Sequence, residues 1–181
     1  MSTPIIWFTG LSLSGKTTLA EGLVDALRRD GHRVEILDGK VVRDELAGFF
    51  GYSREERIKV SRLLATMARL LARHGVVPVV TSITPYEESR EFNRRELGNY
   101  LEIFVDCPVE TCMERDPQGL YRRAMRGDLR HFVGVDDPYE LPRRPDLTVR
   151  TAAEPAADSI RRVREFVTGA IASIHAEPAA R

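Results

Sequence analysis

Residues 10–18 read Gly10-Leu11-Ser12-Leu13-Ser14-Gly15-Lys16-Thr17-Thr18, a complete G-x-x-x-x-G-K-[ST] phosphate-binding loop. The apolar run Ile5-Ile6-Trp7-Phe8 precedes it, and a helical pattern follows it from Leu19. This context matters because the motif works where a strand leads through a glycine-permissive turn to a helix N-terminus. The free N–H groups of that terminus then surround phosphates. Residues 10–18 therefore predict a binding site for a nucleoside triphosphate.

The composition indicates one hydrophobic core and no excess of either charge. The 181 residues are 43% hydrophobic, which is enough to bury one good core. Basic and acidic residues number 27 each, so no net field is available for binding nucleic acid or an anionic membrane. No apolar stretch reaches transmembrane length, and the N-terminus lacks a basic-then-apolar signal. We expect a cytoplasmic protein whose partners include neither nucleic acid nor membrane.

The two cysteines, Cys107 and Cys112, lie five positions apart. That spacing matches no common zinc pattern, and no histidines cluster nearby. We expect two free thiols in a reducing compartment.

Apolar, β-rich runs alternate with helical patterns along the chain, which predicts a parallel sheet with crossover helices. The expected strands are Ile5–Thr9, Arg33–Leu37, Val76–Ser82, Leu101–Asp106 and a short Asp146–Arg150. The expected helices are about Lys16–Arg29, Arg54–Arg73, Glu87–Leu97, Val109–Glu114 and Ala156–Ile174. They predict an α/β three-layer fold, with an about five-stranded parallel sheet and helices on both faces. Residues 1–175 would form a single domain, followed by a flexible tail at residues 176–181.

Two further segments have distinct patterns. In the helix predicted at 54–73, one stripe indicates the core face; it consists of Ile58, Leu63, Leu64, Met67, Leu70 and Leu71. Gly75 is expected to end this helix. The segment from Asp116 to Pro145 is rich in Arg, Asp, Gly and Pro, with little periodicity. Such a long segment is either disordered or a functional lid, and a phosphate-loop protein favours an arginine-rich lid at about residues 116–145.

Asp38 ends the second predicted strand and helps to identify the class of phosphate-loop protein. In an open parallel sheet the carboxyl ends of the strands face the ligand crevice. Asp38 is therefore expected near the phosphates, as a ligand to Mg²⁺-bound water or as a carboxylate that orients the acceptor. The alternative is an Asp that caps a helix or turn before Gly39. No Asn-Lys-x-Asp motif for guanine occurs, and the strand at 76–82 lacks the acidic residue of many motor ATPases. A small kinase fits best.

Phosphoryl transfer chiefly requires positioning and neutralisation of charge. Lys16 suits the β- and γ-phosphates, and the hydroxyl of Thr17 suits Mg²⁺. Lid arginines such as Arg115, Arg122 and Arg123 suit the transferring group. We expect ATP and Mg²⁺ as cofactors, with Arg115 and Arg122 in the ATP site.

Several longer motifs are typical of one family. The chain contains Asp38-Gly39-x-x-x-Arg43, a helix bearing Arg57, Ile83-Thr84-Pro85-Tyr86, Arg115-Asp116-Pro117-x-Gly119-Leu120-Tyr121 and Phe132-x-Gly134-Val135-Asp136-Asp137-Pro138-Tyr139-Glu140. With these motifs it resembles adenylylsulfate (APS) kinases from about Ile5 to Thr151. The resemblance implies transfer of the ATP γ-phosphoryl group to the 3′-hydroxyl of adenylylsulfate, in sulfate assimilation. It also implies a P-loop kinase-type fold and a homodimer. A functional link to an ATP sulfurylase is a further expectation.

The resemblance implies site residues as well. Lys16, Asp38 and Arg43 would be catalytic, with Thr84 at a position where the family carries a Ser that some descriptions phosphorylate. The acceptor would contact Asp38, Lys40, Arg43, Tyr52, Arg57, Val60, Ile83, Thr84 and Phe132. Among these, Arg43 and Arg57 would grip the phosphosulfate, and Tyr52 and Phe132 would sandwich the adenine. Thr17 and Asp38 would serve the metal.

Ordinary structural roles remain open for three of these residues. Arg57 could be a solvated face residue of its helix. Phe132 could be an apolar anchor for the lid. Tyr52 could form a hydrophobic staple before the expected N-cap Ser53.

The acceptor half departs from the family pattern at four positions. Lys40 replaces an Asp; it would either turn outward into solvent or bind an extra anionic group on a different acceptor. Val60 replaces a polar Asn, Thr84 replaces Ser, and Glu87 replaces Arg. These differences leave two alternatives open. One is a related kinase for another small anionic nucleotide or metabolite, and the other is a catalytically silent ATP-binding regulatory subunit.

Overall fold

A five-stranded parallel sheet forms the centre of the structure, a computed structural model that describes residues 3–46 and 48–176. The strands are β1 (Ile5–Thr9), β2 (Val34–Asp38), β3 (Val77–Thr81), β4 (Tyr100–Asp106) and β5 (Leu147–Arg150). Their order is β2-β3-β1-β4-β5, and every pairing is parallel. The predicted sheet is confirmed, with strand ends within one residue of those expected.

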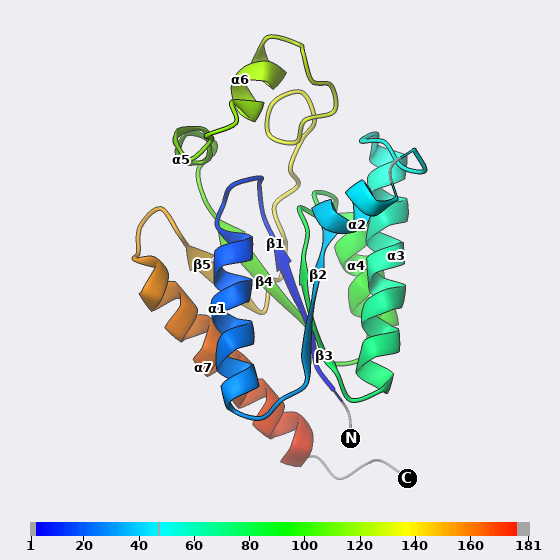
Figure 1. Cartoon of the computed structure of the whole chain (residues 1–181), viewed down its shortest axis with the longest axis vertical. Coiled ribbons are helices and arrows are strands. Elements are labelled where there is room, and N and C mark those ends of the chain that lie inside the picture. Colours follow the sequence, from blue (N-terminus) through cyan, green and yellow to red (C-terminus); the bar gives the residue numbers. More distant parts are fainter. Residues whose placement is uncertain (1–2, 47, 177–181) are drawn as a thin grey trace.

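Helices cover both faces of this sheet (Figure 1). They are α1 (Lys16–Arg29), α2 (Gly39–Glu45), α3 (Arg54–Arg73), α4 (Glu87–Glu96), α5 (Val109–Glu114), α6 (Leu120–Met125) and α7 (Ala156–Ala176). Helices α1 and α7 lie on one face, and α3 and α4 lie on the other. The three-layer α/β prediction is therefore confirmed.

The central strand β1 explains why both layers form. Ile6 and Phe8 pack into one apolar cluster with residues of α1 and α7. Ile5 and Trp7 point the other way, into a second cluster built mainly with residues of α3. Because successive strand side chains alternate between the two faces, a strand covered on both faces must be apolar throughout. All five residues of β1 are buried.

Two short helices, α2 and α6, were not predicted. Asp38 caps α2: its Oδ1 accepts hydrogen bonds from the backbone N–H groups of Lys40 at 2.8 Å and Val41 at 3.1 Å. Helix α6 lies within the segment expected to lack periodic structure, and its Tyr121 is fully buried in a small apolar cluster. Both are short helices that tertiary contacts stabilise, and neither shows a clear periodicity in the sequence, whereas the equally short α5 was predicted. The segment at 116–145 is thus partly helical.

The predicted core stripe of α3 was wrong in part. Its buried residues are Arg57, Val60, Ser61, Leu64, Ala65 and Ala68. Leu70 is 51% exposed, whereas Leu64 is fully buried. The buried face combines Leu64 with the small residues Ser61, Ala65 and Ala68, whereas Leu70 lies outside it. Gly75, with φ of 71°, follows α3 as expected of a residue that ends a helix.

The remaining predictions concern the end of the chain and the cysteines. Ala176 is the last residue of α7, and residues 177–181 of the predicted tail lie outside the described residues. Cys107 and Cys112 are buried and free, as predicted. Across residues 3–46 and 48–176, no helix is long and apolar enough to cross a membrane.

Candidate active site

The phosphate loop adopts backbone conformations that require glycine. Gly10 has φ of 149° and Gly15 has φ of 102°. A Cβ atom on Gly10 would lie 2.5 Å from the carbonyl oxygen of Val105 and 2.9 Å from Oγ of Ser14. Helix α1 begins at Lys16, directly after Gly15. The loop therefore delivers a helix N-terminus, with its free N–H groups, to the carboxyl edge of the sheet.

Lys16 folds back onto its own loop. Its Nζ donates to the carbonyl oxygen of Gly10 at 3.0 Å and to that of Leu11 at 2.6 Å. Burial lowers the pKa of Lys16 to about 8, and the carboxylate of Asp38 acts in the opposite direction. Among the described residues no carboxylate lies within ion-pair distance of this ammonium, so an incoming phosphate would gain a charge-assisted contact.

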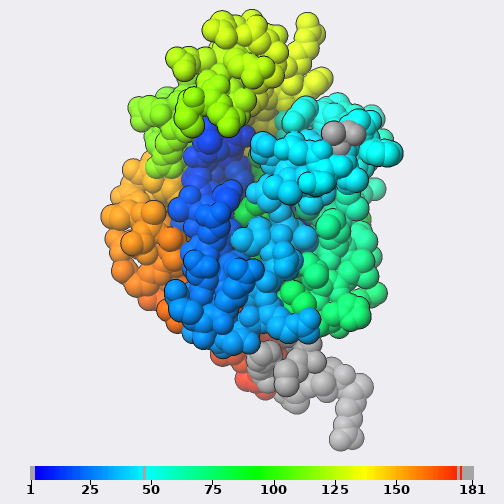
Figure 2. Space-filling model, in the orientation of Figure 1, coloured from blue at the N-terminus to red at the C-terminus, as the bar shows by residue number. Residues whose placement is uncertain are grey.

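Two cavities meet at this lysine. The loop cavity, of about 490 Å³, is lined by the phosphate loop and the start of α1, together with Arg115, Thr151 and Glu154. The lid cavity, of about 520 Å³, lies between β2–α2, α3, the loop after β3 and residues 116–133. Leu13, Lys16 and Thr17 line both cavities. In Figure 2 the lid segment stands above the blue phosphate loop, with the cyan α2–α3 segment beside it. This arrangement suits two ligands that meet at Lys16.

Asp38 serves the fold and also faces the lid cavity. Its capping bonds to α2 confirm the structural alternative, and its Oδ2 accepts a hydrogen bond from Oγ1 of Thr81 at 2.7 Å. The same residue lines the lid cavity beside Lys16 and Thr17. These bonds fix the orientation of the carboxylate in the wall of the lid cavity.

Lys40 turns outward along α2. Its side chain is 77% exposed, and its Nζ lies 2.6 Å from Oδ2 of Asp44, one turn further on. This ion pair raises the pKa of Lys40. Of the two interpretations of this departure from the family, the geometry favours a solvated residue at the cavity margin.

Two arginines lie side by side in the lid cavity without an acidic partner. Arg57 is only 9% exposed, so its interpretation as a solvated face residue is wrong. Its Nε donates to the carbonyl oxygen of Tyr52 at 2.9 Å, and its Nη2 donates to that of His131 at 2.6 Å. Nη1 of Arg43 donates to the carbonyl oxygen of Gly51.

No carboxylate oxygen of the described residues pairs with either guanidinium. Burial lowers the pKa of both groups, and Arg43 lowers that of Arg57 further. Burying like charges without a counter-ion is unfavourable. The pair is therefore suited to binding an anionic ligand.

Two aromatic residues border the same cavity. The Tyr52 ring is 4.7 Å from the guanidinium of Arg43 and 5.4 Å from that of Arg57. The Phe132 ring packs edge-on against Tyr121, with centroids 4.9 Å apart. Tyr121 in turn donates from its hydroxyl to the carbonyl oxygen of Ser12 at 2.9 Å. Phe132 thus anchors the lid to the phosphate loop and also lines the lid cavity.

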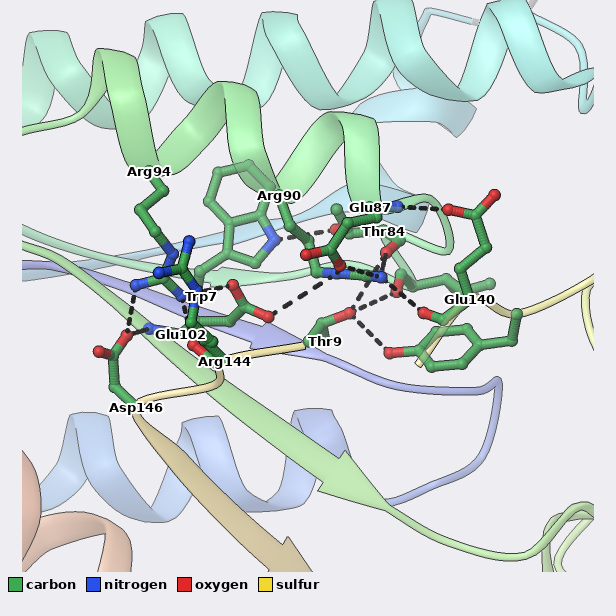
Figure 3. Close-up of polar contacts among 12 residues, drawn as sticks. Trp7, Thr9, Thr84, Glu87, Arg90, Arg94, Glu102, Glu140, Arg144 and Asp146 are labelled. Carbon is green, nitrogen blue, oxygen red and sulfur yellow. Dashed lines mark hydrogen bonds and ion pairs between the residues drawn. The ribbon is translucent and has the colours of Figure 1, made fainter. Parts of the chain in front are cut away.

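The loop after β3 forms one wall of the lid cavity. Thr84 is 2% exposed, and its Oγ1 accepts a hydrogen bond from Nε1 of Trp7 at 2.8 Å (Figure 3). The carbonyl oxygen of Ile83 accepts one from Oγ1 of Thr9 at 2.7 Å. Val60 lines the cavity from α3 but is 3% exposed and belongs to the apolar core. An apolar residue therefore suits this position.

Several residues singled out in the sequence line neither cavity, among them Gly10, Leu11, Ser14 and Arg123. Arg122 is exposed and lines neither cavity, whereas Arg115 lines the loop cavity and donates to the carbonyl oxygen of Thr151 at 2.7 Å. Glu87 also lines neither cavity, and its carboxylate binds Arg90. The Glu87 difference is therefore not a change in the cavity lining.

Other lining residues were missed by the sequence analysis. They include Leu19, Thr81, Ser82, Gln118, Leu129, Arg130, His131, Val133, Thr151, Glu154 and Ala156. None of them is a specified position of the motifs quoted above. Their places depend on the path of the lid and of the β5–α7 turn, which no local pattern reveals.

Known proteins share this fold and sequence. Residues 2–150 match the model of the family described as "Adenylylsulphate kinase". An adenylyl-sulfate kinase of Synechococcus sp. (strain JA-3-3Ab) is 45% identical over 155 residues, which cover 86% of this chain and 88% of the relative. An APS kinase of Mycobacterium tuberculosis, solved in complex with AMPPNP and APS, has a TM-score of 0.87 at 33% identity, covering 92% of this chain and 98% of its own. The chain belongs to the adenylylsulphate kinase family.

Proposed function

We propose that this chain transfers the γ-phosphoryl group of ATP to the 3′-hydroxyl of adenylylsulfate, giving 3′-phosphoadenylylsulfate. The observation that carries the proposal is the pair of Arg43, which is half-buried, and Arg57, which is buried. Neither guanidinium pairs with a carboxylate among the described residues, and both line a cavity that meets the phosphate loop at Lys16. Guanidinium groups bind the oxygens of phosphate and sulfate groups through paired, charge-assisted hydrogen bonds. The relative solved with AMPPNP and APS supports two ligands of this kind.

The donor would occupy the loop cavity. Lys16 would leave its own loop carbonyls and bind the β- and γ-phosphates, and Arg115 would border the nucleotide. Thr17 and Asp38 would hold Mg²⁺, which would neutralise charge on the phosphates. Their fit is reasonable because kinase Mg²⁺ sites use one or two protein oxygens together with substrate phosphates. Thr17, which carries a hydroxyl group, lines both cavities. The carboxylate of Asp38 is close enough to Lys16 to oppose part of the lowering of its pKa by burial.

The acceptor would occupy the lid cavity. Arg43 and Arg57 would bind the phosphosulfate, and Tyr52 and Phe132 would offer aromatic faces to the adenine. Asp38, which lines the lid cavity together with Lys16 and Thr17, would orient the 3′-hydroxyl toward the donor. Val60, Ile83 and Thr84 would shape the wall, and Lys40 would lie at the margin. Arg122 would reach the donor only after the lid moves.

Purified protein is incubated with Mg-ATP and adenylylsulfate, and with a panel of other nucleotides, while ADP release is followed. Turnover with adenylylsulfate is the expected result. Turnover with only another acceptor would instead indicate a related kinase. Binding of ATP without turnover on any acceptor would indicate a regulatory subunit. Either outcome would contradict the proposal.

We further propose that residues 1–175 fold as one domain and assemble as a homodimer. Phe49 and Leu141, which are 79% and 69% exposed, are apolar side chains that a second copy would cover. Light scattering would give twice the chain mass of 20.4 kDa for a dimer. The reaction would take place in the cytoplasm during sulfate assimilation, where an ATP sulfurylase would supply the acceptor.

A further inference from the structure

Thr84 has a backbone conformation that a β-branched residue rarely adopts. Its φ is 42°, in the left-handed region. Such a conformation costs on the order of 1–3 kcal/mol and persists only where surrounding contacts impose it. Thr84 and its two neighbours, Ile83 and Pro85, all line the lid cavity. Its conformation therefore shapes the wall against which the acceptor would lie.

Arg90, on α4, holds this loop and the end of the lid with one guanidinium (Figure 3). Its Nη1 donates to the carbonyl oxygen of Thr84 at 2.7 Å. Its Nη2 donates to the carbonyl oxygen of Glu140 at 2.6 Å. The side chain of Arg90 is 1% exposed and lines neither cavity, so it would act on a ligand only through these two carbonyl groups.

Acidic side chains fix the orientation of this guanidinium. Oε2 of Glu87 accepts from Nε at 2.9 Å and from Nη2 at 2.7 Å. Oε1 of Glu102, on β4, lies 3.8 Å from Nε. Because the guanidinium is planar with donors in a rigid fork, binding on one edge directs the remaining donors. Glu87 thus aims Arg90 at the two carbonyl groups.

Glu140 joins the lid to the same loop by further bonds. Its backbone N–H donates to the carbonyl oxygen of Pro85 at 2.8 Å, and its Oε2 accepts from the backbone N–H of Glu87 at 2.7 Å. Its Oε1 accepts from Nη1 of Arg54 at 3.1 Å. The cavity wall at 83–85 and the end of the lid are therefore fastened to one another around Arg90.

We propose that Arg90 is a positioning residue for the phosphoryl acceptor. It keeps Thr84 in the left-handed conformation and fastens the lid end at Glu140, so that the lid cavity is formed before the acceptor arrives. The inference rests on the proposed function. It adds to the residues that would contact the acceptor one that acts without touching it. Loss of this contact should weaken acceptor binding much more than donor binding, because the loop cavity shares none of these residues.

The test compares Arg90→Ala and Arg90→Lys with Arg95→Ala. Arg95 lies on the same helix and has a side chain 71% exposed, which pairs with the neighbouring Glu96 and lies 5.8 Å from the centroid of the Phe92 ring. Steady-state rates are measured with adenylylsulfate and ATP varied separately, and thermal unfolding is followed in parallel. Arg90→Ala should raise the KM for adenylylsulfate at least about tenfold and that for ATP less than about twofold, with Arg95→Ala unchanged. Equal increases in both KM values, or none, would overturn the inference.

A double-mutant cycle covers the case in which Arg90→Ala does not fold. Glycine adopts a left-handed φ at little cost, so Thr84→Gly removes the strain that Arg90 is proposed to hold. Arg90→Lys should then raise the KM for adenylylsulfate several-fold in the unaltered chain but less in Thr84→Gly. Additive effects would contradict the inference alone. If the unaltered chain does not turn over adenylylsulfate, the proposed function fails and the inference fails with it.

Discussion

The Nζ atom of Lys16 lies 2.6 Å from the carbonyl oxygen of Leu11, so the loop lysine binds its own loop where phosphate oxygens would otherwise lie. A ligand must replace this contact and the one to Gly10. The replacement is favourable because a phosphate carries full negative charge and a carbonyl carries only a partial one.

Lys16→Ala should therefore abolish turnover. Removing a group that stabilises charge in the transition state lowers kcat by about a hundredfold or more. ADP release at saturating ATP measures the effect. Lys59→Ala, at an exposed position of α3, is the control. Retained activity in Lys16→Ala would overturn the assignment of the phosphate loop.

Binding of ATP should take up a proton in mildly alkaline solution. Burial lowers the pKa of Lys16 to about 8 in the free protein, so much of this amine is neutral at about pH 8.5. Phosphates favour the charged ammonium and would raise its pKa again. Calorimetry in buffers of different ionisation enthalpy should show an uptake that is larger at about pH 8.5 than at about pH 7. Lys16→Arg, charged throughout, should show none.

Arg57→Ala should weaken acceptor binding selectively. A hydrogen bond to a charged group contributes about 1.5–3 kcal/mol, so the KM for adenylylsulfate should rise roughly tenfold to a hundredfold. The KM for ATP should change little because Arg57 does not line the loop cavity. Arg62→Ala, on the exposed face of α3, is the matched control. An equal loss with Arg62→Ala would argue against a phosphosulfate site at Arg57.

Lys40→Asp tests the departure from the family at that position. Because Lys40 is exposed and paired with Asp44, the substitution should leave the KM for adenylylsulfate within about twofold. The new like-charge pair with Asp44 should cost the helix only a few tenths of a kcal/mol. A large gain in activity with adenylylsulfate would instead show that Lys40 selects a different acceptor.

Glu102→Gln should alter how stability depends on pH. Burial raises the pKa of Glu102 to about 7 in the folded protein, although Arg90 and Arg94 partly oppose the shift. Its folded pKa thus exceeds the unfolded value of 4.5, so the folded state binds the extra proton between these values. The proton on Glu102 therefore contributes to the free energy of unfolding. This contribution is complete below the unfolded pKa and is lost as pH rises through about 7. Denaturant unfolding of the wild type between about pH 5 and 7 should show this decline, and Glu102→Gln should reduce it.

The contrast between α1 and α2 shows which elements could be predicted from sequence. Helix α1 follows a complete loop motif and has nearly four turns of apolar periodicity, so its start and end were correct. Helix α2 has only seven residues. It is stabilised by the capping hydrogen bonds that Asp38 accepts and by contacts with α3, which the local sequence does not reveal. The site shows the same contrast. The donor loop is nine contiguous residues, whereas the acceptor cavity draws on segments from residue 12 to residue 133.

By itself, the sequence determined the strand–loop–helix unit at Ile5–Arg29, the parallel sheet and the set of candidate arginines, because these depend on local spacing and side-chain chemistry. Tertiary structure alone decided the state of each charged residue. In the folded protein Arg57 is buried without an ion pair to a carboxylate, and Lys40 pairs with Asp44. Arg122 lines neither cavity. Tertiary structure also directed Arg90 at Thr84 and Glu140. The physical reason is that desolvation and pairing of a charge depend on neighbours brought together from distant parts of the chain, which no local pattern contains.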